Sequence, residues 1–116
     1  MIEFKDKKQA LYITKDNELV KLLCNVYNDT TNSNLQPISI GGATYARAFN
    51  NFVSFGANFP GNIDMCHQVD EFINIDQLIL ATNIYAKAIY ELTKWVDLIN
   101  GRLILEYYVF ACFNIK

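Results

Sequence analysis

The segment "NIDQLILATNIYAKAIYELTK", residues 74 to 94, constrains the fold more than any other part of this sequence. Its apolar residues recur at three- and four-residue spacing, which is typical of a helix with one broad apolar face. Asn74, followed three residues later by Gln77, resembles a capping box and marks the start. We therefore predict a long amphipathic helix over about residues 75 to 94. The predicted apolar face comprises Ile75, Leu78, Ile79, Thr82, Tyr85, Ala86, Ile89 and Leu92.

A strand and a shorter helix are predicted at the start of the chain. The stretch "QALYITKDN" is rich in strand formers, and it ends at Asp16 and Asn17, either of which could cap a following helix. Apolar residues then recur at helical spacing until the turn-forming residues "NDTTNSN" interrupt them. This pattern predicts a helix over about residues 17 to 28.

Two more strands are predicted between the helices. One lies around Pro37 to Ile40, and the other is "NFVSFGANF", which ends at Gly56 and a Pro60-Gly61 turn. The order strand, helix, strand, strand, long helix indicates an α/β fold class. Residues 95 to 116 differ in character, because the Asn100-Gly101 turn signal leads into an apolar run that reads as a strand or a buried helix.

Composition excludes several classes of function. The chain has 116 residues, 52% of them hydrophobic, which suits one globular domain. A net charge of −2 with scattered Lys and Arg argues against a nucleic-acid partner. The charged N-terminus lacks the apolar core of a signal peptide, and no apolar stretch reaches the roughly 18 residues of a membrane span. We therefore expect no membrane partner and a cytoplasmic location.

His67 is the only histidine, and it raises the question of a metal site. Zinc sites need three or four protein ligands. The nearby candidates Asp64, Cys66, Asp70 and Glu71 match no compact zinc motif, and neighbouring strand residues point to opposite faces. The residues alone leave two readings open, a metal ligand or a hydrogen-bonded structural or surface histidine.

The remaining candidates for chemistry are also ambiguous. Gly41-Gly42 can serve a turn with positive φ or the close approach of a ligand. The three cysteines are odd in number and far apart, which favours reduced packing residues over a disulfide framework or a CxxC zinc site. No GxSxG elbow, phosphate loop or GxGxxG motif is present.

The order of the motifs is more specific than any single motif. The stretch "ISIGGATYARAFNNFVSFGANFPGNIDMCHQVDEFINIDQLILATNIYAKAIYELTK" resembles the C-terminal end of bacterial di-zinc dipeptidases of the Xaa-His dipeptidase (PepV) type. These enzymes belong to the clan of aminoacylases, carboxypeptidases and succinyl-diaminopimelate desuccinylases. With the upstream "ALYITKDNELVKLLCNVYND", the resemblance covers about residues 8 to 94. It rests on a GG-[AG]-T-Y-A-R loop, a strand end, a P-G turn, an H-Q-x-[ND]-E block and a long helix.

The resemblance implies a role for several residues. His67 matches the last zinc ligand of the family, and Glu71 matches an acid that orients this histidine or its loop. Arg47 is implied to bind a substrate carboxylate or to pin the loop structurally, two roles that both suit its guanidinium group. The implied substrate-binding loop consists of Gly41, Gly42, Ala43 and Thr44.

The resemblance also implies that most of the catalytic site lies outside this chain. In the family, two zinc ions activate water, and the other ligands, the catalytic Glu and a further histidine come from other segments. A chain with one histidine cannot supply those histidines, so we expect no catalytic residue here and no activity in isolation. Residues 1–94 then form the C-terminal part of a catalytic domain, and residues 95–116 form a tail without family resemblance.

Three interpretations follow. In the first, the chain is a C-terminal piece of a zinc-dependent dipeptidase and is inactive alone. In the second, it is a non-catalytic interaction module that binds or complements a separate N-terminal fragment. In the third, it is a small α/β protein whose resemblance to the dipeptidases carries no present function. A dipeptide substrate is implied for the intact enzyme only. One departure from the family motif is Asn50-Asn51, where the resemblance leads us to expect Asp-Asn.

Overall fold

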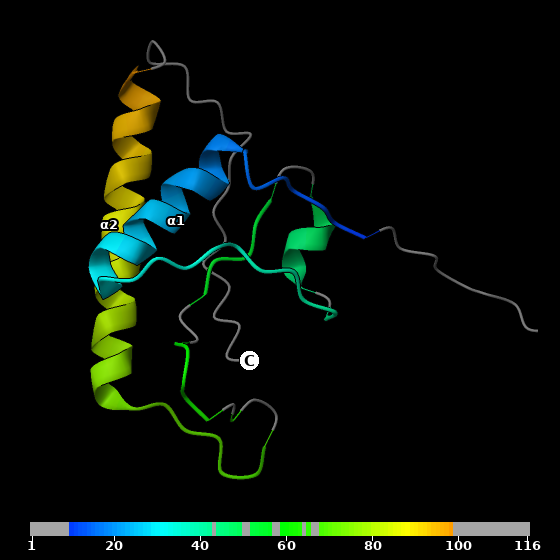
Figure 1. The fold of residues 1–116 in the computed structure, drawn as a ribbon, viewed down its shortest axis with the longest axis vertical. Coiled ribbons are helices and arrows are strands. Elements are labelled where there is room, and N and C mark those ends of the chain that lie inside the picture. Colours follow the sequence, from blue (N-terminus) through cyan, green and yellow to red (C-terminus); the bar gives the residue numbers. More distant parts are fainter. Residues whose placement is uncertain are drawn as a thin grey trace, which may run out of the picture.

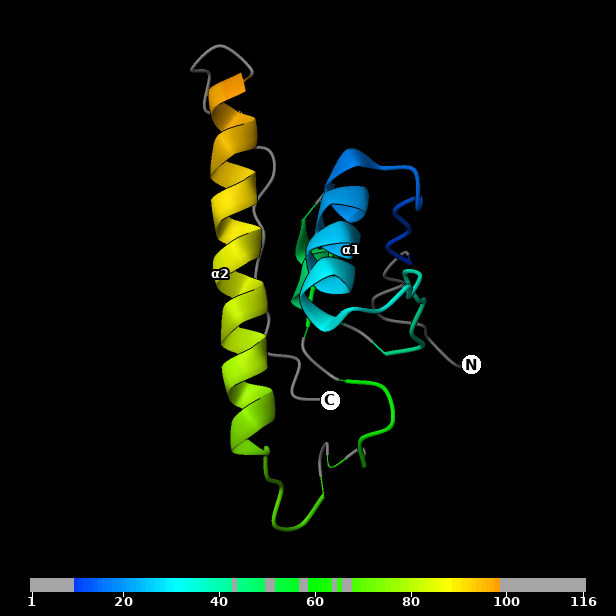
Figure 2. The same ribbon diagram turned by 60° about the vertical axis from the view of Figure 1, so that its left-hand side comes forward.

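The structure is a computed structural model that describes residues 10–42, 44–49, 52–56, 59–63, 65 and 68–98. Within these residues the chain forms two α-helices, α1 (Glu18–Thr31) and α2 (Ile75–Leu98). A short 3₁₀ helix, η1 (Tyr45–Ala48), lies between them in the sequence. The two α-helices pack against each other, and they lie side by side in both ribbon views (Figures 1 and 2).

The start of α1 is fixed by Asn17. Its side-chain oxygen accepts hydrogen bonds from the backbone N–H groups of Leu19, at 2.9 Å, and Val20, at 3.4 Å. These bonds satisfy donors that the first turn of a helix leaves without a partner. Of the two predicted capping residues, Asn17 is therefore the one that caps the helix.

The end of α1 lies three residues beyond the predicted position. The hydroxyls of Thr30 and Thr31 donate to backbone carbonyls one turn earlier, at 2.7 and 2.8 Å, so these turn-forming residues remain in the helix. Asn32 then adopts a left-handed conformation, with φ of 50°, and its N–H closes the helix on the carbonyl of Asn28. Asn tolerates this conformation better than most residues, which explains why the helix ends there.

Asn28 also holds the chain that leaves α1. Its side-chain amide donates to the carbonyl of Leu35, at 3.0 Å, while its side-chain oxygen accepts from the N–H of the same residue, at 2.9 Å. The hydroxyl of Ser33 donates to that oxygen as well. The side chain of Asn28 thus forms the hydrogen bonds that a neighbouring backbone segment would otherwise form with Leu35. These bonds hold residues 33–35 close to the helix.

The core lies where the two helices meet. Leu19, Leu23 and Val26 of α1 pack with Ile84 and Ala88 of α2, and all five residues are buried. Burying a side chain of this size contributes about 1.5 to 3 kcal/mol, except for the smaller alanine. Around this cluster lie the partly buried residues Leu22, Tyr27, Val53, Phe55, Phe59, Leu80 and Leu92.

The segment after η1 crosses to this core and packs its aromatic residues against both helices. The rings of Tyr27 and Phe59 stack at 6.2 Å, and Phe55 meets Tyr85 edge to face at 6.0 Å. Burial raises the pKa of the Tyr27 hydroxyl above its ordinary value. A turn at Pro60-Gly61 follows, as predicted, with φ of 85° at the glycine.

The long helix confirms the sequence prediction, but its packed face differs. α2 starts at the predicted residue and runs to Leu98, since the next turn signal comes only at Asn100-Gly101. The side that meets α1 carries Ala81, Ile84 and Ala88. Six residues of the predicted apolar face are exposed, namely Ile75, Leu78, Ile79, Thr82, Ala86 and Ile89.

The described residues contain no strand, so the predicted strands and the α/β class stay predictions. The segments 10–14, 37–40 and 52–56 are irregular. A strand exists only through hydrogen bonds to a neighbouring strand, and strand-forming residues alone do not supply that neighbour. In the part of the chain that the structure describes, no helix is long and apolar enough to cross a membrane. Residues 99–116, most of the predicted tail, lie outside that part.

Asn17→Ala tests the cap of α1. We expect the free energy of unfolding to fall by about 1 kcal/mol, because two helix N–H groups lose their acceptor. Urea denaturation followed by circular dichroism measures this change. Asn25→Ala, at an exposed position inside the same helix, is the control, and an equal loss in both variants would contradict the capping role.

Ile84→Ala tests the packing between the helices. Ile84 is 1% exposed, so we expect a loss of about 2 to 5 kcal/mol from the cavity that the substitution leaves. The matched control is Ile89→Ala on the same helix, where the side chain is 61% exposed and the loss should stay below about 1 kcal/mol. Similar denaturation midpoints for the two variants would show that the helices do not pack in this way.

Candidate functional site

The predicted substrate loop follows the irregular segment that leaves α1. Gly41 and Gly42 are exposed, and Ala43 lies outside the described residues. Gly41 does not have a positive φ, and a Cβ atom there would meet nothing within 4 Å. A positive φ is therefore not the reason for a glycine at position 41. The open space beside Gly41 leaves room for a ligand to approach the backbone closely.

Thr44 joins this loop to the segment after η1. Its hydroxyl oxygen accepts a hydrogen bond from the hydroxyl of Ser54, at 2.8 Å, and its carbonyl accepts from the N–H of Arg47, at 3.1 Å. A hydroxyl that accepts one bond still has its own hydrogen to donate. The sequence did not indicate Ser54, since a serine ten residues away gives no periodic signal.

Arg47 lies in η1, between two buried residues in the sequence. Ala46 is buried within η1, and Phe52 is buried just after it. The ring of Phe52 stacks on that of Phe49 with 4.4 Å between their centroids. The Nε atom of the Arg47 guanidinium group is buried. A partly buried guanidinium group suits both predicted roles, a structural pin and a carboxylate partner.

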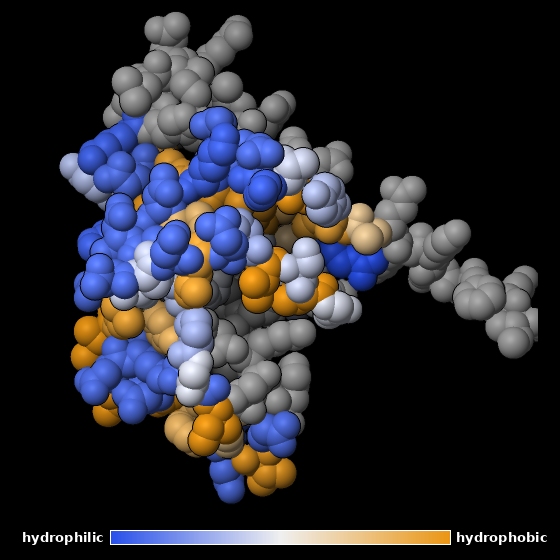
Figure 3. All heavy atoms as spheres, viewed as in Figure 1, coloured by the Kyte–Doolittle hydropathy of each residue, from blue (hydrophilic) through white to orange (hydrophobic). Residues whose placement is uncertain are grey.

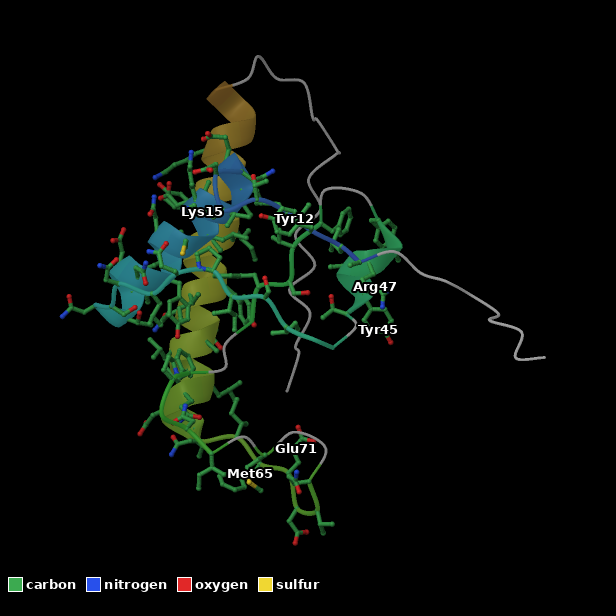
Figure 4. All side chains as sticks on the ribbon, turned by 45° about the vertical axis from the view of Figure 1, so that its right-hand side comes forward. Tyr12, Lys15, Tyr45, Arg47, Met65 and Glu71 are labelled. Carbon is green, nitrogen blue, oxygen red and sulfur yellow. The ribbon has the colours of Figure 1, made fainter. Side chains whose placement is uncertain are left out.

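Glu71 belongs to a different part of the molecule. It is exposed on the loop that enters α2, together with Asp70, whose φ of 60° marks a sharp turn. Figure 4 shows Glu71 near Met65 at one end of the structure and Arg47 with Tyr45 well away from them. The structure therefore does not bring the predicted substrate loop and Glu71 together.

The predicted zinc ligand His67 lies outside the described residues, as do Asp64 and Cys66, so its role stays a prediction. Among the residues that the structure does describe, no three His, Cys, Asp or Glu side chains lie close enough to hold a metal ion. A zinc ion needs three or four such ligands. The described donors therefore do not fit a zinc ion by themselves.

Comparison with known proteins shows relatives that are much longer than this chain. It is 49% identical over 92 residues to "Putative dipeptidase YtjP" of Bacillus subtilis, a match that covers 79% of this chain and 20% of that protein. It is 46% identical over 81 residues to a "Putative dipeptidase" of Staphylococcus epidermidis, covering 70% of this chain and 17% of that protein. This chain thus spans about a fifth of the length of these relatives. No solved structure matches it.

One family model covers every residue that the sequence singled out for a site. The model describes the peptidase family M20/M25/M40, and it matches residues 1–91. This range includes the glycine loop with Thr44, Arg47, His67, Glu71 and most of α2. The chain therefore belongs to the peptidase family M20/M25/M40.

Proposed function

We propose that this chain forms one wall of the active site of a zinc-dependent dipeptidase of the Xaa-His dipeptidase type. The observation that carries the proposal is the family match over residues 1–91, supported by relatives whose names call them dipeptidases. All the proposed site residues lie within that match. The activity belongs to a complete site, of which this chain supplies a part.

The glycine loop and Arg47 receive the substrate in this proposal. Gly41 leaves open space above the backbone, so an extended dipeptide can approach it closely. The Thr44 hydroxyl can donate to a substrate oxygen while it accepts from Ser54. The planar guanidinium of Arg47 is suited to pair with a carboxylate.

His67 is the proposed contribution to the metal site, and Glu71 supports the loop that carries it. Bound zinc would supply an activated water for hydrolysis. A single imidazole does not hold zinc tightly, since affinity depends on several simultaneous ligands. We therefore propose that the remaining ligands and the catalytic acid-base group come from another segment, that the isolated chain is inactive, and that the enzyme works in the cytoplasm.

A second candidate function is a non-catalytic interaction module that binds or complements a separate N-terminal half. The exposed aliphatic side chains of α2 favour this function, because they offer a contact surface that needs no metal. The two candidates differ in whether the assembled complex hydrolyses a dipeptide.

Replacing the matched 92-residue segment of YtjP by the corresponding residues of this chain tests the catalytic proposal. We expect zinc-dependent hydrolysis of Xaa-His dipeptides, and His67→Ala should lower kcat/KM by more than about 100-fold. Losing even an outer partner of a metal ligand costs 10- to 100-fold. Gln68→Ala, at the exposed neighbouring position, is the control. Unchanged activity in the His67→Ala variant would contradict the proposed ligand.

Zinc titration of the isolated chain tests the claim that His67 alone does not bind zinc tightly. We expect no stoichiometric binding in calorimetry at neutral pH, and the same weak heats from wild type and His67→Ala. Tight binding of one zinc ion per chain, lost in His67→Ala, would show instead that this chain completes a metal site alone.

A further inference from the structure

The hydroxyl of Thr44 does not cap the helix that this residue precedes. Thr44 is the N-cap residue of η1, where a threonine side chain normally accepts a hydrogen bond from a backbone N–H of the first turn. Within η1, which the structure describes in full, its side chain accepts no such bond. The backbone carbonyl of Thr44 accepts from the N–H of Arg47 instead, at 3.1 Å. The short helix therefore does not account for the orientation of this hydroxyl.

Ser54 accounts for that orientation. Its hydroxyl donates to the Thr44 hydroxyl oxygen at 2.8 Å, the usual length for a bond between two hydroxyls. The neighbours of Ser54 in the sequence, Val53 and Phe55, both pack against the core between α1 and α2. Ser54 is itself exposed. The bond therefore connects the hydroxyl of the candidate substrate loop to a segment that is held by the core.

The direction of this bond decides which kind of group Thr44 is suited to bind. A hydroxyl has one hydrogen to donate and two lone pairs that accept. Because Thr44 accepts from Ser54, it keeps its own hydrogen for an acceptor. Hydrogen bonds in a chain polarise one another, so a hydroxyl that accepts one bond becomes a stronger donor. The pair therefore favours a carboxylate or carbonyl oxygen of a ligand over an ammonium group.

The surface beside the pair suits a small organic ligand. Tyr45 is 79% exposed and Phe49 is 49% exposed, on either side of Arg47 in the sequence. On the face seen in Figure 3, hydrophobic and hydrophilic side chains lie next to each other around η1. Sites for small molecules combine apolar and aromatic side chains with a few polar groups that fix the orientation of the ligand.

We propose that Ser54 is a positioning residue of the dipeptidase site, which orients and polarises the Thr44 hydroxyl so that it donates to a substrate oxygen. Ser54 acts through Thr44 and does not touch the substrate. The proposal rests on the proposed function, and it adds a residue that the family resemblance did not imply.

Steady-state kinetics of a grafted YtjP, in which residues of this chain replace the matched 92-residue segment, test this role. Ser54→Ala should lower kcat/KM for Ala-His by about 3- to 10-fold, as expected for the loss of one hydrogen bond between neutral groups. Ser54→Thr keeps a hydroxyl and should restore most of the activity. Ser54→Val is its matched control, because valine has the shape of threonine without the hydroxyl. Tm should be nearly equal in all three variants, since Ser54 is exposed.

A double-mutant cycle shows whether Ser54 acts through Thr44. In a Thr44→Val background, Ser54→Ala should change kcat/KM by less than about twofold, because the acceptor of its hydrogen bond is already absent. An equal further loss in that background would overturn the proposal. So would a Ser54→Val variant as active as Ser54→Thr, or a loss of activity that follows a lowered Tm.

The outcomes for Ser54 and for the proposed function are distinguishable. Hydrolysis with equal kcat/KM in all Ser54 variants supports the proposed function and contradicts the role of Ser54. If the grafted YtjP hydrolyses no Xaa-His dipeptide, the proposed function is contradicted, and calorimetry with Ala-His decides on Ser54. A Kd that Ser54→Ala weakens by about 3- to 10-fold and Ser54→Thr restores supports the positioning role. Equal Kd values, or no binding, overturn it.

Discussion

The contact between α1 and α2 is the interaction on which the rest of the described structure depends. Leu19, Leu23 and Val26 meet Ile84 and Ala88 there, although more than fifty residues of sequence separate the two sets. Aromatic residues of the segment between the two helices pack against this contact. Because short helices are marginally stable in water, each helix needs the apolar side of the other.

Polar side chains position the candidate substrate loop relative to that core. Asn28 holds the chain that leaves α1 by a pair of hydrogen bonds to Leu35, and the Ser54 hydroxyl ties Thr44 to the segment that packs on the helices. The loop is thus connected to both neighbouring segments, while its glycines stay exposed.

The apolar character of α2 links the fold to the proposed function. α2 packs on α1 on one side, and several of its large apolar side chains elsewhere are exposed. The relatives are about five times as long as the matched segment, and the proposed catalytic site also requires residues that this chain lacks.

The sequence alone determined both helices and the Pro60-Gly61 turn, because periodicity, caps and glycine act over a few residues. It determined the family through the order of its motifs, and with it the residues proposed for the site. Only the tertiary structure decided that Ile84 rather than Ile89 faces α1. Both sides of α2 are apolar, so the spacing of its apolar residues does not show which side packs on α1. It also decided the Thr44–Ser54 bond, which depends on two segments that only folding brings together.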